Sequence, residues 1–379
     1  MGRSIFEPEH EQVRRTTREF LDREALPHLE RWTEQGHVDR EIFCRAGEIG
    51  LLGMDVPTEY GGAGMDDYRY NVVVSEECAR GGSGVGLTLQ NDLIAPYIKS
   101  LGTEGQKKRF LTGITSGELL GCIAMSEPGA GSDLAGIRTS ARRDGDDWVL
   151  NGSKTFISGG ILADFAIVVT RTDAEAGHKG FTLFLVEDGM PGFAKGKKLD
   201  KIGNRASDTA ELFFDNVRVP DANRLGEIGG GFYALMRNLP QERLGIAIIG
   251  LIAAERALEI TMQYAKERTA FGQPIGQFQV NRHALSEMHT KLTIARVYID
   301  HAIMAVTRGE LSAQEAAGAK WWMSELEWEV VDRCMQMFGG YGYINEYEIA
   351  AIWRNSRVQR VYGGTTEILK DLVGRGLGF

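Results

Sequence analysis

A strand-rich block between two helical regions is the feature that most limits how this chain can fold. From about residue 122 to 225, runs rich in β-branched and aromatic residues follow one another, namely ADFAIVVTRT, KGFTLFLVED and TAELFFDNVRVP. The pairs Asp144-Gly145 and Asn151-Gly152 are turn signals on either side of the strand Trp148-Val149-Leu150. Because few helical patterns separate these strands, we expect a small antiparallel barrel or sandwich instead of βαβ units.

Helical periodicity characterises the chain on both sides of this block. In EHEQVRRTTREFLDREALPHLERW, near the N-terminus, apolar residues recur every three or four positions. The stretch 81–98 has a helical pattern with many glycines, which close helix packing and a ligand explain equally well. Further on, we expect a buried helix that begins at Pro240 and long helices over about 281–306 and 313–337.

These patterns divide the chain into three units. A chain of 379 residues is too long for one ordinary core, so several packed domains are expected. We predict an α+β protein with an N-terminal α-helical domain at 1–121, a barrel-like antiparallel β domain at 122–225 and a C-terminal helical bundle domain at 226–379.

Charge and composition argue against several classes of protein. The net charge of −9 disfavours a nucleic-acid-binding protein, which normally carries a basic face. The longest apolar run, LGIAIIGLIAA at 244–254, is too short for membrane insertion, and the acidic N-terminal stretch lacks the apolar core of a secretory signal. The four cysteines form no C-x-x-C pair and are typical of reduced thiols, so we expect a cytoplasmic protein.

Several catalytic signatures are missing from the sequence. No G-x-G-x-x-G follows a strand, and neither a Walker A lysine motif nor a G-x-S-x-G elbow occurs. The seven histidines are dispersed, and His283 and His289 lie six residues apart on an expected helix, so we expect no metal site. Any difficult chemistry then belongs to an organic cofactor.

Four glycine-containing stretches remain as candidate ligand sites. They are AMSEPGAGSDLAG at 124–136, ERTAFGQPIGQFQ at 267–279, QMFGGYGYINEY at 336–347 and RVYGGTTEI at 360–368. Glycines let the backbone approach a ligand closely, hydroxyl groups donate hydrogen bonds, and an arginine can hold a phosphate with two hydrogen bonds. Taken singly, these stretches are at least as typical of structural turns, helix ends and surface ion pairs.

In combination and in this order, the four stretches resemble the acyl-CoA dehydrogenase family over essentially the whole chain. The turn YGGT, the helix sequence LPQERL, the strand pair WVLNGSK and the strand TAELFF resemble the long-chain and isovaleryl-CoA dehydrogenase branch in particular. The resemblance implies an N-terminal helical domain, a middle β domain and a C-terminal four-helix bundle. It also implies FAD-dependent oxidation of an acyl-CoA to the trans-2-enoyl-CoA, with electrons passed to an electron-transfer flavoprotein, in a homotetramer built as a dimer of dimers.

The resemblance also implies roles for individual residues. Those expected to contact FAD are Met125, Ser126, Gly131, Ser132, Phe156, Ser158, Arg268, Phe271, Gln279, Gln336, Gly339, Gly340, Thr365 and Glu367. Within this set, Arg268, Phe271 and Gln279 resemble contacts to the FAD of a neighbouring subunit. The residues expected to contact the acyl thioester are Ser132, Arg243, Gly363 and Gly364.

The catalytic base follows from a residue that is missing. Many family members carry a glutamate directly after the tyrosine of the final turn, where this chain has Gly363. The branch with LPQERL has its base on the long C-terminal helix instead, and the resemblance therefore indicates Glu242. Taken without the resemblance, a glutamate in the first turn of a helix is more typical of a solvated partner of the helix dipole. A base that works near neutral pH needs its pKa raised from about 4.3 by burial.

Other functions of the same fold stay open at this point. The acyl group could be attached to a carrier protein instead of CoA, and the reduced flavin could react with oxygen, as in an oxidase. A catalytically silent assembly subunit is a third alternative, which the carboxylate at Glu242 and the intact flavin motifs disfavour. The sequence leaves the length and branching of the acyl chain undetermined.

Overall fold

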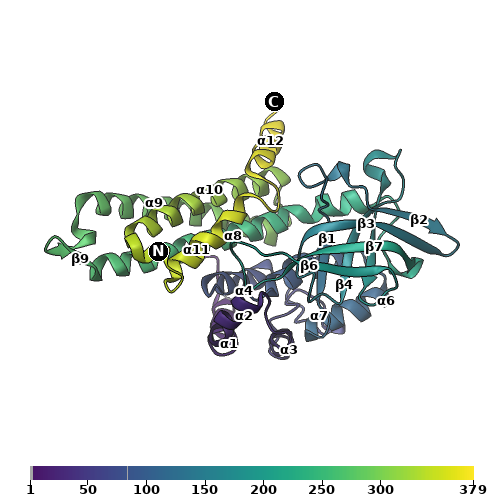
Figure 1. Ribbon diagram of the computed structural model, residues 1–379, viewed down its shortest axis with the longest axis horizontal. Helices are drawn as coiled ribbons and strands as arrows, with labels where there is room; N and C mark the ends of the chain where they lie inside the picture. The colour runs from purple at the N-terminus through teal and green to yellow at the C-terminus, as the bar shows by residue number, and fades with distance from the viewer. Residues whose placement is uncertain (1–2, 83) are drawn as a thin grey trace.

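Helices, a sheet and a second set of helices follow one another along the chain in the computed structural model, which describes residues 3–82 and 84–379 (Figure 1). The first set comprises α1 (Pro8–Glu24), α2 (Leu29–Gln35), α3 (Glu41–Glu48), α4 (Tyr68–Arg80), α5 (Ala95–Leu101), α6 (Glu104–Gln106) and α7 (Thr112–Ser116). A π-helical segment, Leu89–Ile94, leads directly into α5. The helix expected over 81–98 is therefore irregular at its start, and Ser83 lies outside the described residues.

The central part of the chain forms one eight-stranded sheet in the described residues. Its strands are β1 (Gly121–Ala124), β2 (Ser140–Asp144), β3 (Asp147–Ser158), β4 (Phe165–Arg171), β5 (Phe181–Glu187), β6 (Phe193–Lys198), β7 (Thr209–Pro220) and β8 (Arg224–Leu225). Most pairs are antiparallel, as expected, but β1 and β2 each pair in parallel with β4. Strands β4 and β5 are buried on both faces, because helices cover one face and other strands of the sheet cover the opposite one.

Only one of the two turns expected around Trp148 exists. Asp144 pairs with Asp147, so Gly145 lies in a tight hairpin, as predicted. Asn151-Gly152 instead lies inside β3, where the register with β7 shifts. Gly152 is needed there because a Cβ would lie only 2.4 Å from the hydroxyl of Thr139, in a backbone conformation with φ of +150°. The glycine thus permits close backbone packing within the strand and does not end it.

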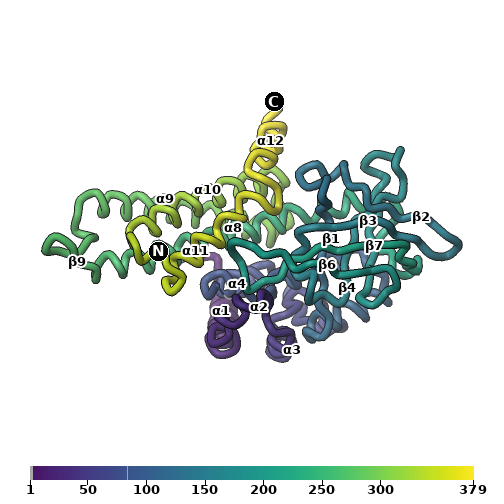
Figure 2. The backbone as a smooth tube through the Cα atoms, viewed as in Figure 1, coloured from purple at the N-terminus to yellow at the C-terminus, as the bar shows by residue number. Residues whose placement is uncertain are grey.

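Three long helices dominate the C-terminal part of the chain, and Figure 2 shows them lying side by side. The elements are α8 (Gly231–Glu267), β9 (Thr269–Ala270), β10 (Gln273–Pro274), α9 (Gln279–Thr307), α10 (Ala313–Phe338), α11 (Glu348–Ser356) and α12 (Thr366–Gly376). The long helices predicted over 281–306 and 313–337 are confirmed as α9 and α10. In the described residues, no helix combines the length and the apolar character that a membrane crossing requires.

The expected start of the buried helix at Pro240 is wrong. Helix α8 begins at Gly231, and Pro240 lies inside it. The proline is tolerated because Ala234, Leu235 and Leu239 are buried and hold the preceding turns against the protein, which compensates for the lost backbone hydrogen bond. Glu242 consequently lies well inside a buried helix, beyond the reach of the helix dipole that a first-turn position would have implied.

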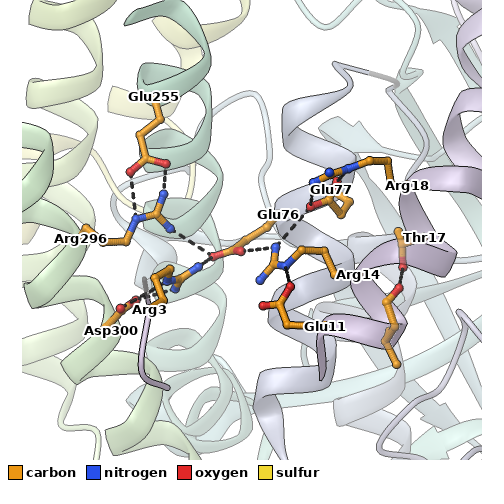
Figure 3. Close-up of polar contacts among 11 residues, drawn as sticks. Arg3, Glu11, Arg14, Thr17, Arg18, Glu76, Glu77, Glu255, Arg296 and Asp300 are labelled. Atoms are coloured by element: carbon orange, nitrogen blue, oxygen red, sulfur yellow. Dashed lines mark hydrogen bonds and ion pairs between the residues drawn. The ribbon is translucent and has the colours of Figure 1, made fainter. Parts of the chain in front are cut away.

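A network of ion pairs joins the N-terminal helices to the C-terminal bundle (Figure 3). Glu76 of α4 is buried and accepts hydrogen bonds from Arg3 and, at 2.6 Å, from Arg14 of α1. The guanidinium of Arg296 on α9 lies 3.5 Å from the same carboxylate. Glu76 therefore links three segments that are far apart in the sequence.

Loss of the Glu76 carboxylate should destabilise the protein strongly. In Glu76→Ala, three partly buried guanidinium groups lose their common buried partner, and breaking a buried pair costs roughly 3–5 kcal/mol. Differential scanning calorimetry at a fixed protein concentration should show a clearly lower unfolding temperature. As a control, Glu259→Ala removes an exposed pair with Arg80, which is worth about 1 kcal/mol or less. Equal effects of the two substitutions would contradict the assignment.

Candidate active site

A buried carboxyl group on α8 forms the centre of the candidate site. The side chain of Glu242 is only 6% exposed, and burial raises its pKa to about 7. The hydroxyl of Tyr97, on α5, donates a 2.9 Å hydrogen bond to Oε1 of Glu242. This hydrogen bond and the neighbouring charge of Arg243 both favour the carboxylate and partly offset the burial. Glu242 can therefore take up or release a proton near neutral pH.

The turn at 362–365 lies against the same face of α8. Ile246 follows Glu242 by one helical turn, and its Cδ1 atom would lie 2.3 Å from a Cβ at Gly363. Gly363 and Gly364 both have positive φ, at +66° and +104°, which favours glycine at both positions. The predicted substrate residues Arg243, Gly363 and Gly364 are thus brought together beside Glu242.

Two buried cations hold the carbonyl groups of this turn. Nε of Arg243 donates to the carbonyl of Gly363 at 3.2 Å, and Nζ of Lys320 donates to the carbonyl of Gly364 at 2.7 Å. Because a trans peptide points its N–H away from its carbonyl, the N–H groups of Gly364 and Thr365 are directed to the opposite side. Burial lowers the pKa of Lys320 to about 8, and the charge of Arg243 adds to this effect.

The sequence interpretation missed Tyr97 and Lys320. Both residues are almost completely buried, and each lies in an otherwise ordinary helical pattern with no motif around it. Their role depends on contacts with Glu242 and Gly364, which are 145 and 44 residues away in the chain. For Lys320, the only hint in the sequence is a lysine within a predicted buried helix face.

The first group of predicted FAD residues lies on the last part of β3 and on the 124–136 stretch beside it. The backbone N–H of Thr155 donates to the carbonyl of Ser126, and Lys154 donates to the carbonyl of Met125, so the start of the 124–136 stretch is fixed against β3. Phe156, between Thr155 and Ser158, is 70% exposed with φ of +60°. A large apolar ring held outward in this uncommon conformation is typical of a ligand-contacting residue. Gly131 and Ser132 of the same stretch are exposed.

A second group of predicted FAD residues lies at the opposite end of the long helices, near β9 (Figure 1). Arg268, Gln336, Gly339 and Gly340 line one surface pocket of about 470 Å³. A Cβ added at either glycine would meet nothing within 4 Å, so the pocket is open above them. Phe271 is 95% exposed at the tip of the β9–β10 hairpin, and Gln279 begins α9. The two groups therefore do not form a single site within one chain.

Thr365 and Glu367 form the start of α12. The hydroxyl of Thr365 accepts a 3.4 Å hydrogen bond from the N–H of Ile368 and so caps the helix, and the carboxyl group of Glu367 is exposed to solvent. Together with Gly363 and Gly364, these residues connect the turn beside Glu242 to an exposed helix start.

Comparisons with known proteins point to one family. Family models for acyl-CoA dehydrogenases match three parts of the chain, the N-terminal domain at 7–118, the middle domain at 122–217 and the C-terminal domain at 229–378. The chain is 46% identical to the mitochondrial long-chain specific acyl-CoA dehydrogenase of Sus scrofa, over 98% of this chain and 87% of that protein. It is 37% identical to the mitochondrial isovaleryl-CoA dehydrogenase of Pongo abelii, over 97% of this chain and 88% of that protein. The crystal structure of an acyl-CoA dehydrogenase from Geobacillus kaustophilus is 44% identical and superimposes over the full length of both chains with a TM-score of 0.98.

Removal of the Tyr97 hydroxyl should raise the pKa of Glu242 above about 7. The hydrogen bond favours the charged carboxylate, so Tyr97→Phe makes the carboxylate harder to form. A hydrogen bond worth about 1 kcal/mol corresponds to a rise of roughly half a pKa unit to one unit. Infrared difference spectra of the protonated carboxyl band, recorded against pH with Glu242→Gln as the blank, measure this pKa. A lower pKa in Tyr97→Phe would contradict the proposed hydrogen bond.

Substitution of Gly363 should be costly even by alanine. Gly363→Ala places a Cβ in the left-handed region, which costs roughly 1–2 kcal/mol, and pushes against Ile246. The unfolding temperature should fall, and Ile246→Ala in the same chain should recover the part due to the clash. Gly374→Ala is the matched control, because Gly374 lies within α12 with open space around it, so alanine should be neutral or stabilising. Identical behaviour at positions 363 and 374 would be inconsistent with this geometry.

Proposed function

The chain belongs to the acyl-CoA dehydrogenase family, and on this basis we propose that it oxidises the Cα–Cβ bond of an acyl-CoA thioester with Glu242 as the catalytic base. The observation that carries the proposal is the buried carboxyl of Glu242, with a pKa of about 7, on the face of α8 that lies against the 362–365 turn. A carboxyl group in this state can accept a proton and later release it near neutral pH.

The residues around Glu242 support removal of an α-proton. The α-carbon of a thioester becomes acidic enough only when hydrogen-bond donors polarise the carbonyl, an effect typically worth about 3 kcal/mol for each donor. The N–H groups of the 362–365 turn are the nearest candidates, since Arg243 and Lys320 hold the turn's carbonyl groups on the other side. The protein then orients the thioester, and Oε1 or Oε2 of Glu242 accepts the proton from the α-carbon.

Members of this family are flavin enzymes, and we propose FAD as the flavin. The residues present fit such a group. The exposed ring of Phe156 offers an apolar face, and Gly339 and Gly340 let the backbone come close to a ligand. The guanidinium of Arg268 can pair with a phosphate. Met125, Ser126, Gly131, Ser132 and Ser158 would hold the ring, with Thr365 and Glu367 at the helix start. When bound, FAD supplies the acceptor for the β-hydride.

The separation of the two FAD groups supports an oligomer. The pocket beside Arg268 adjoins β9 and Phe156 belongs to β3, and Figure 1 shows these two strands toward opposite ends of the molecule, which supports contact of the two groups with FAD from different subunits. We propose that Arg268, Phe271 and Gln279 contact the FAD of a second subunit, in a homotetramer built as a dimer of dimers. The nearly complete exposure of Phe271 in the single chain supports a role in such a contact.

Three further assignments stay proposals. The electron acceptor is an electron-transfer flavoprotein, the location is a reducing, cytoplasmic compartment, and the domains are 1–121, 122–225 and 226–379. The free thiols, three of which are buried, support the proposed location. The start of β1 at Gly121 and of α8 at Gly231 supports the proposed domain boundaries.

Replacement of Glu242 should abolish substrate oxidation without reducing the amount of flavin that the protein binds. Glu242→Gln keeps the size of the side chain and lacks the proton acceptor, so the rate of flavin reduction by an acyl-CoA should fall by roughly 10²- to 10⁴-fold or more. Stopped-flow absorbance of the FAD-loaded enzyme measures this rate, and in the unmodified enzyme it should rise with pH through about 7.

The control for this experiment is Glu259→Gln, which changes an exposed carboxyl on the same helix. Its flavin content and reduction rate should match those of the unmodified enzyme. Normal flavin reduction in Glu242→Gln would show that another group is the base.

A further inference from the structure

A cluster of buried polar groups lies beyond Glu242 and takes no part in the proposed proton transfer. The cluster consists of Asn71 and Ser75 on α4, Asp92 on the π-helical segment and the hydroxyl of Tyr68. Ser75 donates a 2.9 Å hydrogen bond to Oδ2 of Asp92. Among the described residues, no hydrogen bond of ordinary length reaches Oδ1 of Asp92 or the side-chain amide of Asn71, although Asn71 lies close enough to Asp92 to favour its carboxylate. Such groups are rare in folded proteins and call for an explanation.

The two preceding residues on the π-helical segment are fully paired, unlike Asp92. The amide of Gln90 exchanges two hydrogen bonds with the backbone of Gly121. The amide of Asn91 accepts from the N–H of Gly53 and donates to the carbonyl of Leu51. Three successive polar residues are thus fully buried, but only the third, Asp92, keeps an oxygen atom unpaired.

A glycine on α8 leaves room for a small group between Glu242 and the cluster. Gly245 follows Glu242 by three residues and therefore lies on the same face of α8. Although Gly245 is buried, a Cβ there would meet only the hydroxyl of Tyr68, at 3.9 Å. Tyr68 in turn lies close enough to Asp92 for that carboxyl to raise the pKa of the phenol, after the larger effect of burial. The room at Gly245, next to the base, is therefore bordered by the hydroxyl of Tyr68, and Tyr68 lies near Asp92.

The chemistry of the cluster selects one class of group. A hydrocarbon chain that ended there would leave Oδ1 of Asp92 and the amide of Asn71 without a new partner. A carboxylate would face Asp92, whose pKa burial already raises to about 7, and so would add a second negative charge in a dry environment. A hydroxyl group can donate to Asp92 and accept from the amide of Asn71 at the same time.

We propose that Asp92, Asn71 and Tyr68 bind a hydroxyl group on the distal part of the acyl chain, so that the enzyme prefers hydroxylated acyl-CoA substrates to plain alkyl ones of equal length. This inference rests on the proposed function, since it deepens the substrate class of the same site. Because Gly245 has no side chain, the acyl group can pass it and reach the cluster.

The test compares acyl-CoA pairs that differ only in one hydroxyl. The FAD-loaded enzyme is given saturated acyl-CoAs of one length with the hydroxyl at successive carbons beyond Cβ, the alkyl analogue and a carboxylated analogue. For one hydroxyl position, kcat/KM should exceed that of the alkyl analogue by roughly tenfold or more, because the site's polar groups are paired only by that substrate. The carboxylated analogue should be the poorest.

Two variants at Asp92 and one at Gly245 assign the preference to the cluster. Asp92→Leu should reduce the ratio of hydroxylated to alkyl kcat/KM to about one or below. Asp92→Asn, which keeps the size and one of the two acceptor oxygens, should give a ratio between that of Asp92→Leu and that of the unmodified enzyme. Gly245→Val should lower kcat/KM more for the longer chains than for the shortest alkyl substrate. The ratio compares two substrates on one protein, so partial loss of folding does not affect it.

The results that would overturn this inference differ from the result that would overturn the proposed function. Efficient use of alkyl-CoAs with a ratio of one or less at every hydroxyl position would overturn the inference and leave the cluster as a site for buried water. A ratio that Asp92→Leu does not change would overturn it as well. If no acyl-CoA reduces the flavin, the proposed function itself is wrong, and this inference is wrong with it.

Discussion

The burial of helix α8 is the constraint on which the rest of the structure depends. This helix of 37 residues packs against α4, α9, α10 and strand β5, so it contacts both helical regions and the sheet. Residues of its central part are shielded from water on nearly every side. The same burial that stabilises the packing also holds a carboxyl group, Glu242, out of water and shifts its pKa toward neutrality. In this protein, packing and acid–base chemistry have one physical origin.

The order of helices, strands and helices could be predicted because each pattern has its own period and is local. The boundaries of α9 and α10 and the hairpin at Gly145 follow from short-range signals of this kind. Pro240 and Asn151-Gly152 were misread since the local preference for a helix start or a turn was weaker than the tertiary packing around them. Propensity is a weak guide wherever burial decides the conformation.

The candidate site could be predicted only in part. The resemblance to the family indicates Glu242 and the two glycines at 363 and 364, but Tyr97, Lys320 and the Asp92 cluster depend on contacts between distant segments. A buried tyrosine or lysine in a helix has no motif that distinguishes it from a core residue. Its partner, and hence its role, exists only once α5, α8 and α10 are assembled.

The contact between Ile246 and Gly363 limits where the base can lie. Under the proposed mechanism the base lies on α8, and the space that a side chain at 363 would need is already taken by Ile246, next to a backbone with positive φ. A base at position 363 would require changes at Ile246, at the turn and at Glu242 together, because a side chain at 363 alone meets Ile246 on a strained backbone. Side-chain packing therefore couples the three places, so that the position of the base can be altered only by changing them as a set.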